Sequence, residues 1–152
     1  MSNSVKIEFL AAVHSILSGD TELLTATGIN SQKSSARAVA VYNQVQQNAP
    51  VPYVRITLTD SITLQDEPYD YGQPTVQMIS LLVDTFSDYE KECFAITDRL
   101  EFLLNNKPIT TTHFTGSTWH KGTTFLTENY ANPDRVLRHG SMRVRANLEP
   151  LP

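Results

Sequence analysis

The segment TVQMISLLVDTFSDYE, residues 75–90, leads directly from a strand pattern into the start of a helix. Over residues 75–86 the side chains alternate between two faces, as they do in a strand. One face carries Val76, Met78, Leu82 and Phe86, and the other carries Ile79, Leu81 and Val83. Because both faces are apolar, we expect both sides of this strand to be covered by other parts of the protein.

A helix is predicted to follow this strand, over about residues 88–105. Ser87 and Glu90 have the spacing of a capping box, in which both side chains accept hydrogen bonds from free backbone N–H groups. An apolar stripe that includes Cys93 follows at helical spacing. Pro108 then prevents the helix from continuing.

A second helix is predicted at the N-terminal end, where residues 4–18 carry apolar side chains at helical spacing before Gly19. A short helical turn, capped by Asp20, is expected to end by Gly28. Residues 39–45 and 53–63 alternate as strands do. The second of these strands and residues 75–86 are joined by a turn-rich loop, which predicts a long protruding β-hairpin.

The C-terminal third reads as strands over residues 109–114, 125–130 and 136–148. The whole chain therefore has the order helix, strands, helix, strands. This order predicts an α+β fold in a single domain, residues 1–152, with an antiparallel or mixed sheet flanked by the N-terminal helix and the central helix.

Composition excludes several classes of protein. The chain has 12 basic and 16 acidic residues, a net charge of −4, which disfavours a dedicated nucleic-acid binder. A single cysteine allows no disulfide within the chain and indicates a reducing compartment. The apolar runs are far shorter than the roughly 20 residues of a membrane span, so we expect a protein of the cytoplasm with no membrane contact. Its 18% of charged residues suits a subunit that packs against other proteins.

Residues with catalytic or metal-binding potential do not form a recognisable pattern. None of His14, His113, His120 and His139 has metal-ligand spacing, and Cys93 lies on an apolar helix stripe, where a packed thiol is expected. The chain has no nucleophile-elbow serine and no glycine-rich phosphate loop. We therefore predict a protein that is not an enzyme, with no catalytic, cofactor-binding or metal-binding residues.

Three places are candidates for contact with partners or other subunits. The first is the loop at residues 65–74, which is either an interface or an exposed hairpin tip. The second is the Thr/Ser-rich segment at residues 110–121, whose tryptophan is either an interface residue or a core residue. The third is the basic closing strand. The candidate contact residues are Asp66, Glu67, Tyr69, Asp70, Tyr71, Trp119, Arg138, Arg143 and Arg145.

Three segments together resemble a known family. They are NAPVPYV at residues 48–54, the strand-to-helix segment at residues 76–90, and RVLRHGSMRVR at residues 135–145. In order and length of elements the chain resembles the tail terminator, or tail-completion, proteins of tailed bacteriophages, which join the tail to the head.

The resemblance implies a homo-oligomer, a hexameric ring, that caps the tail tube and ends its polymerisation. Its implied partners are the tail tube protein and the head-tail connector or neck proteins. Genome DNA would pass through the lumen without specific binding. The chain would belong to the virion, in its tail or neck, and would be assembled in the cytoplasm of the bacterial host.

Two other interpretations stay open on the sequence. One is a different neck, head-completion or tail-tube subunit of a virion. The other is a cytoplasmic α+β enzyme or ligand-binding protein, which would need a pocket lined by Cys93, His113 or His120.

Overall fold

The computed structural model describes residues 4–25, 39–43, 51–64, 76–131 and 134–151. Its elements are α1 (Val5–Ser18), α2 (Thr21–Thr25), β1 (Ala40–Tyr42), β2 (Tyr53–Leu64), β3 (Val76–Ser87), α3 (Glu90–Leu104), β4 (Lys107–Thr110), β5 (Phe114–Ala131) and β6 (Asp134–Pro150). The six strands form one sheet in the order β1-β2-β3-β6-β5-β4. β1 pairs with β2 in parallel, and each other neighbouring pair is antiparallel. The predicted α+β class with a mixed sheet is confirmed.

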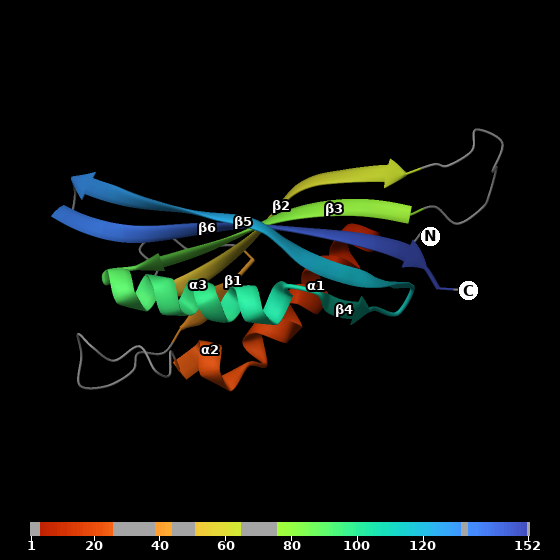
Figure 1. The fold of residues 1–152 in the computed structure, drawn as a ribbon, viewed down its shortest axis with the longest axis horizontal. Helices are drawn as coiled ribbons and strands as arrows, with labels where there is room; N and C mark the ends of the chain where they lie inside the picture. The colour runs from red at the N-terminus through yellow and green to blue at the C-terminus, as the bar shows by residue number, and fades with distance from the viewer. Residues whose placement is uncertain (1–3, 26–38, 44–50, 65–75, 132–133, 152) are drawn as a thin grey trace.

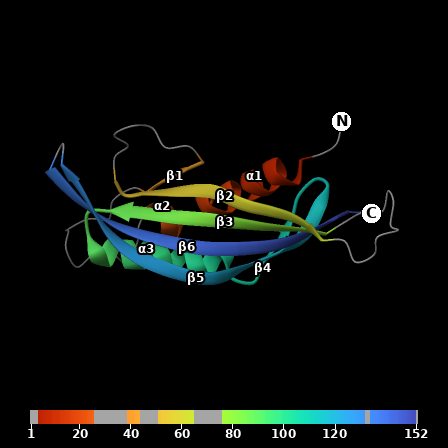
Figure 2. The ribbon, with the colours of Figure 1, turned by 90° about the horizontal axis from the view of Figure 1, so that it is seen from above.

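The molecule has two layers. All three helices lie on one side of the sheet (Figure 1), and the view turned by 90° shows the strands in front of the helices (Figure 2). We call the side of the sheet that faces away from the helices the open face. Side chains on the open face are therefore available to other molecules unless they cover one another.

α1 follows the prediction at both ends. Ser4 caps its first turn by accepting a hydrogen bond from the backbone N–H of Ile7, and Gly19 ends it. The face toward the sheet buries Val5, Phe9, Val13 and Leu17, spaced by four residues. α2 begins as expected at Asp20, whose carboxylate accepts from the N–H of Leu23 at 2.9 Å. The same carboxylate binds Arg99 of α3 at 2.7 and 2.8 Å, which joins α2 to α3.

The start of α3 differs from the predicted capping box. The hydroxyl of Ser87 accepts a hydrogen bond from the N–H of Tyr89 and donates one to the carboxylate of Glu92. Glu90 is the first helical residue and is exposed. Since the helix begins at Glu90, Ser87 lies two residues before the N-cap position, and Glu92 rather than Glu90 comes within reach of it.

The core lies between the sheet and the helices. β3 contributes Ile79, Leu81 and Val83, and β6 contributes Met142, Val144, Ala146 and Leu148, all buried. The expectation that both faces of β3 are covered is wrong for its first half, because Met78 and Leu82 lie half-buried on the open face. It is right for the second half, where Asp84 and Phe86 are buried under neighbouring side chains.

Both hairpins use long strands. β2 and β3 form the predicted hairpin and pair from Tyr53–Phe86 to Leu64–Val76. β5 and β6 form a second hairpin, whose far end extends past α3 (Figure 1). The strand predicted at residues 109–114 is interrupted between β4 and β5, and the strand predicted at residues 125–130 is too short, because β5 already begins at Phe114. Its threonines fit a pleated strand well, but they interrupt the apolar alternation by which a strand is recognised.

Candidate functional site

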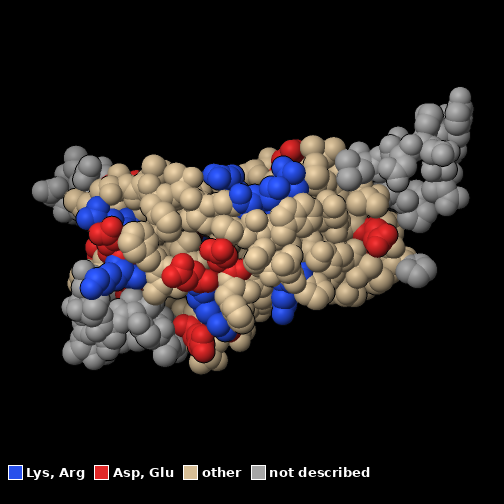
Figure 3. Space-filling model, viewed as in Figure 1, with Lys and Arg blue, Asp and Glu red and all other residues tan. Residues whose placement is uncertain are grey.

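A groove lined by basic side chains lies across the middle of the open face. Arg143 and Arg145 occupy alternate positions of β6 on this face, while Val144 between them faces the core. A bulge in β5 between His120 and Gly122 adds Lys121. The cavity measures about 310 Å³ and is lined by Thr59, Ser80, Leu81, Leu82, Lys121, Arg143, Val144 and Arg145. We call Lys121, Arg143 and Arg145 the basic groove; Figure 3 shows basic side chains gathered over the centre of the sheet.

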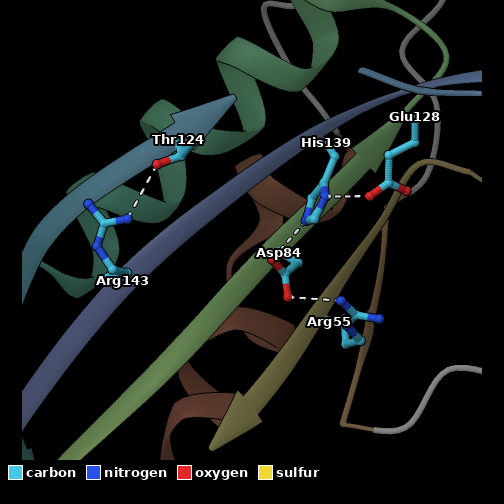
Figure 4. Close-up of polar contacts among 6 residues, drawn as sticks. All are labelled: Arg55, Asp84, Thr124, Glu128, His139 and Arg143. Atoms are coloured by element: carbon cyan, nitrogen blue, oxygen red, sulfur yellow. Dashed lines mark hydrogen bonds and ion pairs between the residues drawn. The ribbon is translucent and has the colours of Figure 1, made fainter. Parts of the chain in front are cut away.

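The charge of the basic groove is not neutralised within the described part of the chain. Arg143 donates to the hydroxyl of Thr124 at 3.3 Å (Figure 4). None of the three cations forms an ion pair with another described residue. The Nε atom of Arg145 is buried and donates no hydrogen bond among the described residues. A buried donor without an acceptor costs about 1–3 kcal/mol, so this groove favours an anionic partner.

Trp119 lies beside the basic groove. It stands opposite Arg145 in the β5–β6 register and is half-buried on the open face, so the interpretation as a core residue is wrong. The ammonium group of Lys121 lies 6.0 Å from the centre of the indole ring. The structure thus brings three candidate residues, Trp119, Arg143 and Arg145, to one place. It adds Lys121, which sequence reasoning missed because a bulge changes the alternation of β5.

Arg138 is separate from the basic groove. Its side chain points to the other face of β6 and donates to the hydroxyl of Thr127 at 2.7 Å. The candidate residues Asp66, Glu67, Tyr69, Asp70 and Tyr71 lie outside the described residues. By sequence they belong to the connection between Leu64 and Val76, the paired ends of β2 and β3.

A largely buried polar cluster joins four strands at one end of the open face. His139 of β6 hydrogen-bonds Asp84 of β3 at 2.8 Å and Glu128 of β5 at 2.9 Å (Figure 4). Arg55 of β2 also binds Asp84, at 3.1 Å. The imidazole stacks on Phe86 with 4.3 Å between ring centres. Because carboxylates only accept hydrogen bonds, both ring nitrogens of His139 donate, and neither is free to act as a base.

The pKa values of this cluster reflect its pairing. Burial alone would lower the pKa of His139, but the hydrogen bond and charge of Asp84, with those of Glu128, outweigh it and raise the pKa. Burial alone would raise the pKa of Asp84, but hydrogen bonds from His139, Ser141 and Arg55 outweigh it and lower the pKa. Both shifts favour a charged pair that holds the strands together.

The other chemically capable residues are occupied or buried. Cys93 is 1% exposed on α3, and burial raises the pKa of its thiol to about 11, which confirms its prediction as a packed side chain. His113 binds Glu8 of α1 at 3.1 Å, and His120 lies 3.4 Å from Glu101 of α3. Over the described ranges, no group of three or more His, Cys, Asp or Glu side chains is placed to hold a metal ion.

The far end of the β5–β6 hairpin exposes apolar side chains. Phe125 is 47% and Leu126 50% exposed on opposite faces of β5, and Val136 of β6 and Phe94 of α3 are 47% and 40% exposed. Phe94 and Phe125 contact each other edge to face, with ring centres 4.9 Å apart. We call these four residues the apolar hairpin end. Beyond Thr118 the outer edge of β5 pairs with no other described strand, so this end also offers free backbone groups.

Comparisons with known proteins give information on the fold. No protein-family model matches the chain, and no curated protein matches it in sequence. Among solved structures, the fold is similar to that of a chain in the virion of a native gene transfer agent particle, with a TM-score of 0.65 and 16% identity. The match covers 97% of this chain and 99% of that chain. At this identity the likeness shows the fold alone. None of the described helices is long and apolar enough to cross a membrane.

Proposed function

We propose that this protein is a structural subunit of a virion, which forms a ring that caps the tail tube and joins the tail to the head connector. The observation that carries the proposal is the end-to-end likeness in fold to a chain of a gene transfer agent virion. The likeness spans almost the full length of both chains, so it concerns the whole domain and not a shared motif. The resemblance in sequence to tail terminator proteins points to the same kind of particle.

The surfaces support a ring-forming subunit. In a closed ring, each copy uses one surface against the copy before it and a different surface against the copy after it. The basic groove suits an acidic surface of a neighbouring copy and the apolar hairpin end suits an apolar one, so they offer two different kinds of contact. As partners we propose the tail tube protein and the neck proteins, with the genome passing through the lumen.

Mass measurement of the purified chain tests this proposal. Native mass spectrometry and light scattering are expected to find a closed oligomer, a hexamer if the tail terminator role is right. An image reconstruction of the assembled particle should then place the ring between tube and head. A chain that stays monomeric at all concentrations, and in the presence of tube protein, would contradict the proposal.

The likeness to a virion chain also supports a second role, as a tail-tube, neck or head-completion subunit. A tube subunit must stack on itself without limit. Long filaments of the purified chain in negative-stain images would therefore favour the tube over the terminator.

A further inference from the structure

We propose that the basic groove binds the acidic segment of a neighbouring copy, residues 65–74, and that this contact forms the ring interface. The inference rests on the proposed ring function and names the contact that would hold the ring together. The contact joins two of the candidate places, the loop at residues 65–74 and the basic closing strand.

The groove is built for carboxylates. Two guanidinium groups and an ammonium line about 310 Å³, with one buried Nε that has no acceptor among the described residues. A guanidinium presents paired N–H donors that match the two oxygens of a carboxylate. The acid nearest in the register is Asp60 of β2, which pairs with Ser80, and Ser80 pairs with Arg145. Asp60 is exposed and forms no ion pair with the groove.

The proposed occupant has the complementary composition. Residues 65–74, QDEPYDYGQP, contain three carboxylates, two tyrosines and no basic residue. Three carboxylates match the three cations of the groove. The tyrosines suit the indole of Trp119 beside it, since aromatic residues with polar tips are common at protein interfaces.

Binding between copies fits the symmetry of a ring. The groove and the segment are different parts of one chain, so each copy would give its segment to one neighbour and its groove to the other. Such a head-to-tail contact closes into a ring when the rotation allows it. A nucleic acid is a poorer fit, because three cations on a chain of net charge −4 release few counterions from phosphates.

Exchange of charges tests the pairing. The groove variant K121E/R143E reverses two exposed cations, and the segment variant D66K/E67K/D70K reverses the three acids. Each variant alone is expected to associate about thirtyfold or more weakly than the unaltered chain. A mixture of the two should form the ring again, because reversed groove and reversed segment are complementary. A contact within one chain would not be restored by mixing.

The matched control is K6E/K91E, which makes the same change in charge at two exposed residues on the helices. It should associate as the unaltered chain does. Circular dichroism and thermal melts of every variant establish that it is folded, and R143Q/R145Q provides a milder groove variant. If the unaltered chain forms a ring and both reversed variants form it equally well, the pairing is wrong while the ring function stands.

A peptide experiment separates the pairing from the ring. The peptide QDEPYDYGQP is titrated into the segment variant, whose own segment no longer competes, and Trp119, the single tryptophan, reports binding by its fluorescence. The expected result is a saturable change in fluorescence. The change should be absent when the substitutions K121E and R143E are introduced into the same chain as the segment substitutions. No change at millimolar peptide overturns the pairing, whether or not the chain forms rings. A change with a DNA oligonucleotide but not with the peptide overturns it in favour of phosphate.

Discussion

Among single residues, His139 lies at the centre of the buried polar cluster. It contacts side chains from β3 and β5 and stacks on Phe86, so one imidazole connects three strands. The charged, buried pair with Asp84 stabilises the fold only in one protonation state. The pKa of His139 is raised in the folded protein. The contribution of His139 to stability is therefore complete below the pKa of an unfolded histidine, about 6.5, and is lost as the pH rises through the folded pKa. The pKa of Asp84 is lowered, so its contribution is present above about 3.9 and is lost as the pH falls through the folded value.

Stability should therefore respond to His139 in a pH-dependent way. His139→Gln is expected to lower the free energy of unfolding by about 1–3 kcal/mol at pH 6, because it leaves the buried carboxylate of Asp84 with Arg55 as its remaining charged partner. The difference should shrink as the pH rises from 6 to 9. Urea denaturation at each pH measures it. His113→Gln, at an exposed histidine, is the control and should show little effect; a loss for His139→Gln that is the same at every pH contradicts the assignment.

Cys93 should be unreactive in the folded protein. With the pKa of its thiol at about 11, the thiolate fraction at pH 8 is about a hundredfold or more below that of a free cysteine. Labelling with iodoacetamide, followed by mass spectrometry, should be slow in buffer and fast in urea. Rapid labelling of the folded chain would show that the thiol is accessible.

Among the elements, the helices owe their positions to particular close contacts. α3 approaches β6 closely because Gly140 has no side chain: a Cβ there would lie 2.8 Å from the hydroxyl of Thr97. α1 is held by apolar side chains at four-residue spacing, which pack toward the sheet, while the opposite face of the helix is open to solvent. Phe9 and Ile7 illustrate the difference, since the first is fully buried and the second is 70% exposed.

Substitutions at these two positions should have very different effects. Phe9→Ala is expected to lower the free energy of unfolding by about 3–5 kcal/mol, because it removes a packed ring and leaves a cavity. Ile7→Ala should change it by less than about 0.5 kcal/mol. Urea denaturation of both variants under one condition makes the comparison. Equal losses would mean that α1 does not pack on the face described.

In the whole molecule, one covered face and one open face define what other molecules can contact. The helices protect the core side of the sheet, while the basic groove crosses the open side and the apolar hairpin end extends past α3 (Figures 1 and 3). Exposed apolar side chains at a free strand edge are costly in an isolated subunit. An assembly that covers them removes this cost, which is consistent with the proposed ring.

A charge at the apolar hairpin end should weaken assembly and spare the fold. Phe125→Asp is expected to weaken association by about tenfold or more, because an aspartate would have to be buried at the contact. The free energy of unfolding should change by less than about 1 kcal/mol, since Phe125 is half exposed.

Native mass spectrometry of a dilution series measures the strength of association, and urea denaturation measures the free energy of unfolding. Phe102→Asp is the matched control and should assemble normally. Phe102 is exposed and lies about two turns after Phe94 in α3. Unchanged assembly of the Phe125→Asp chain would place the subunit contacts elsewhere.

The sequence by itself determined the local structure. The four-residue spacing of α1, the alternation of β2 and β3, and the packed position of Cys93 are all periodic signals, and each depends only on residues close in the chain. A single domain and the absence of catalytic residues stay predictions of the sequence. Two errors of local structure have local causes. Threonines interrupt the apolar alternation in the first half of β5, and α3 begins at Glu90, so that Glu92 and not Glu90 contacts Ser87.

Only the tertiary structure decided which residues meet. Asp84, Glu128 and His139 come from three strands, and the sequence gives no sign that they form one cluster. The bulge of β5 places Lys121 beside Arg143 and Arg145, whereas plain alternation along β6 puts Arg138 on the other face. The face of a strand is set by its register with its neighbours, and register depends on long-range pairing, which no local pattern contains.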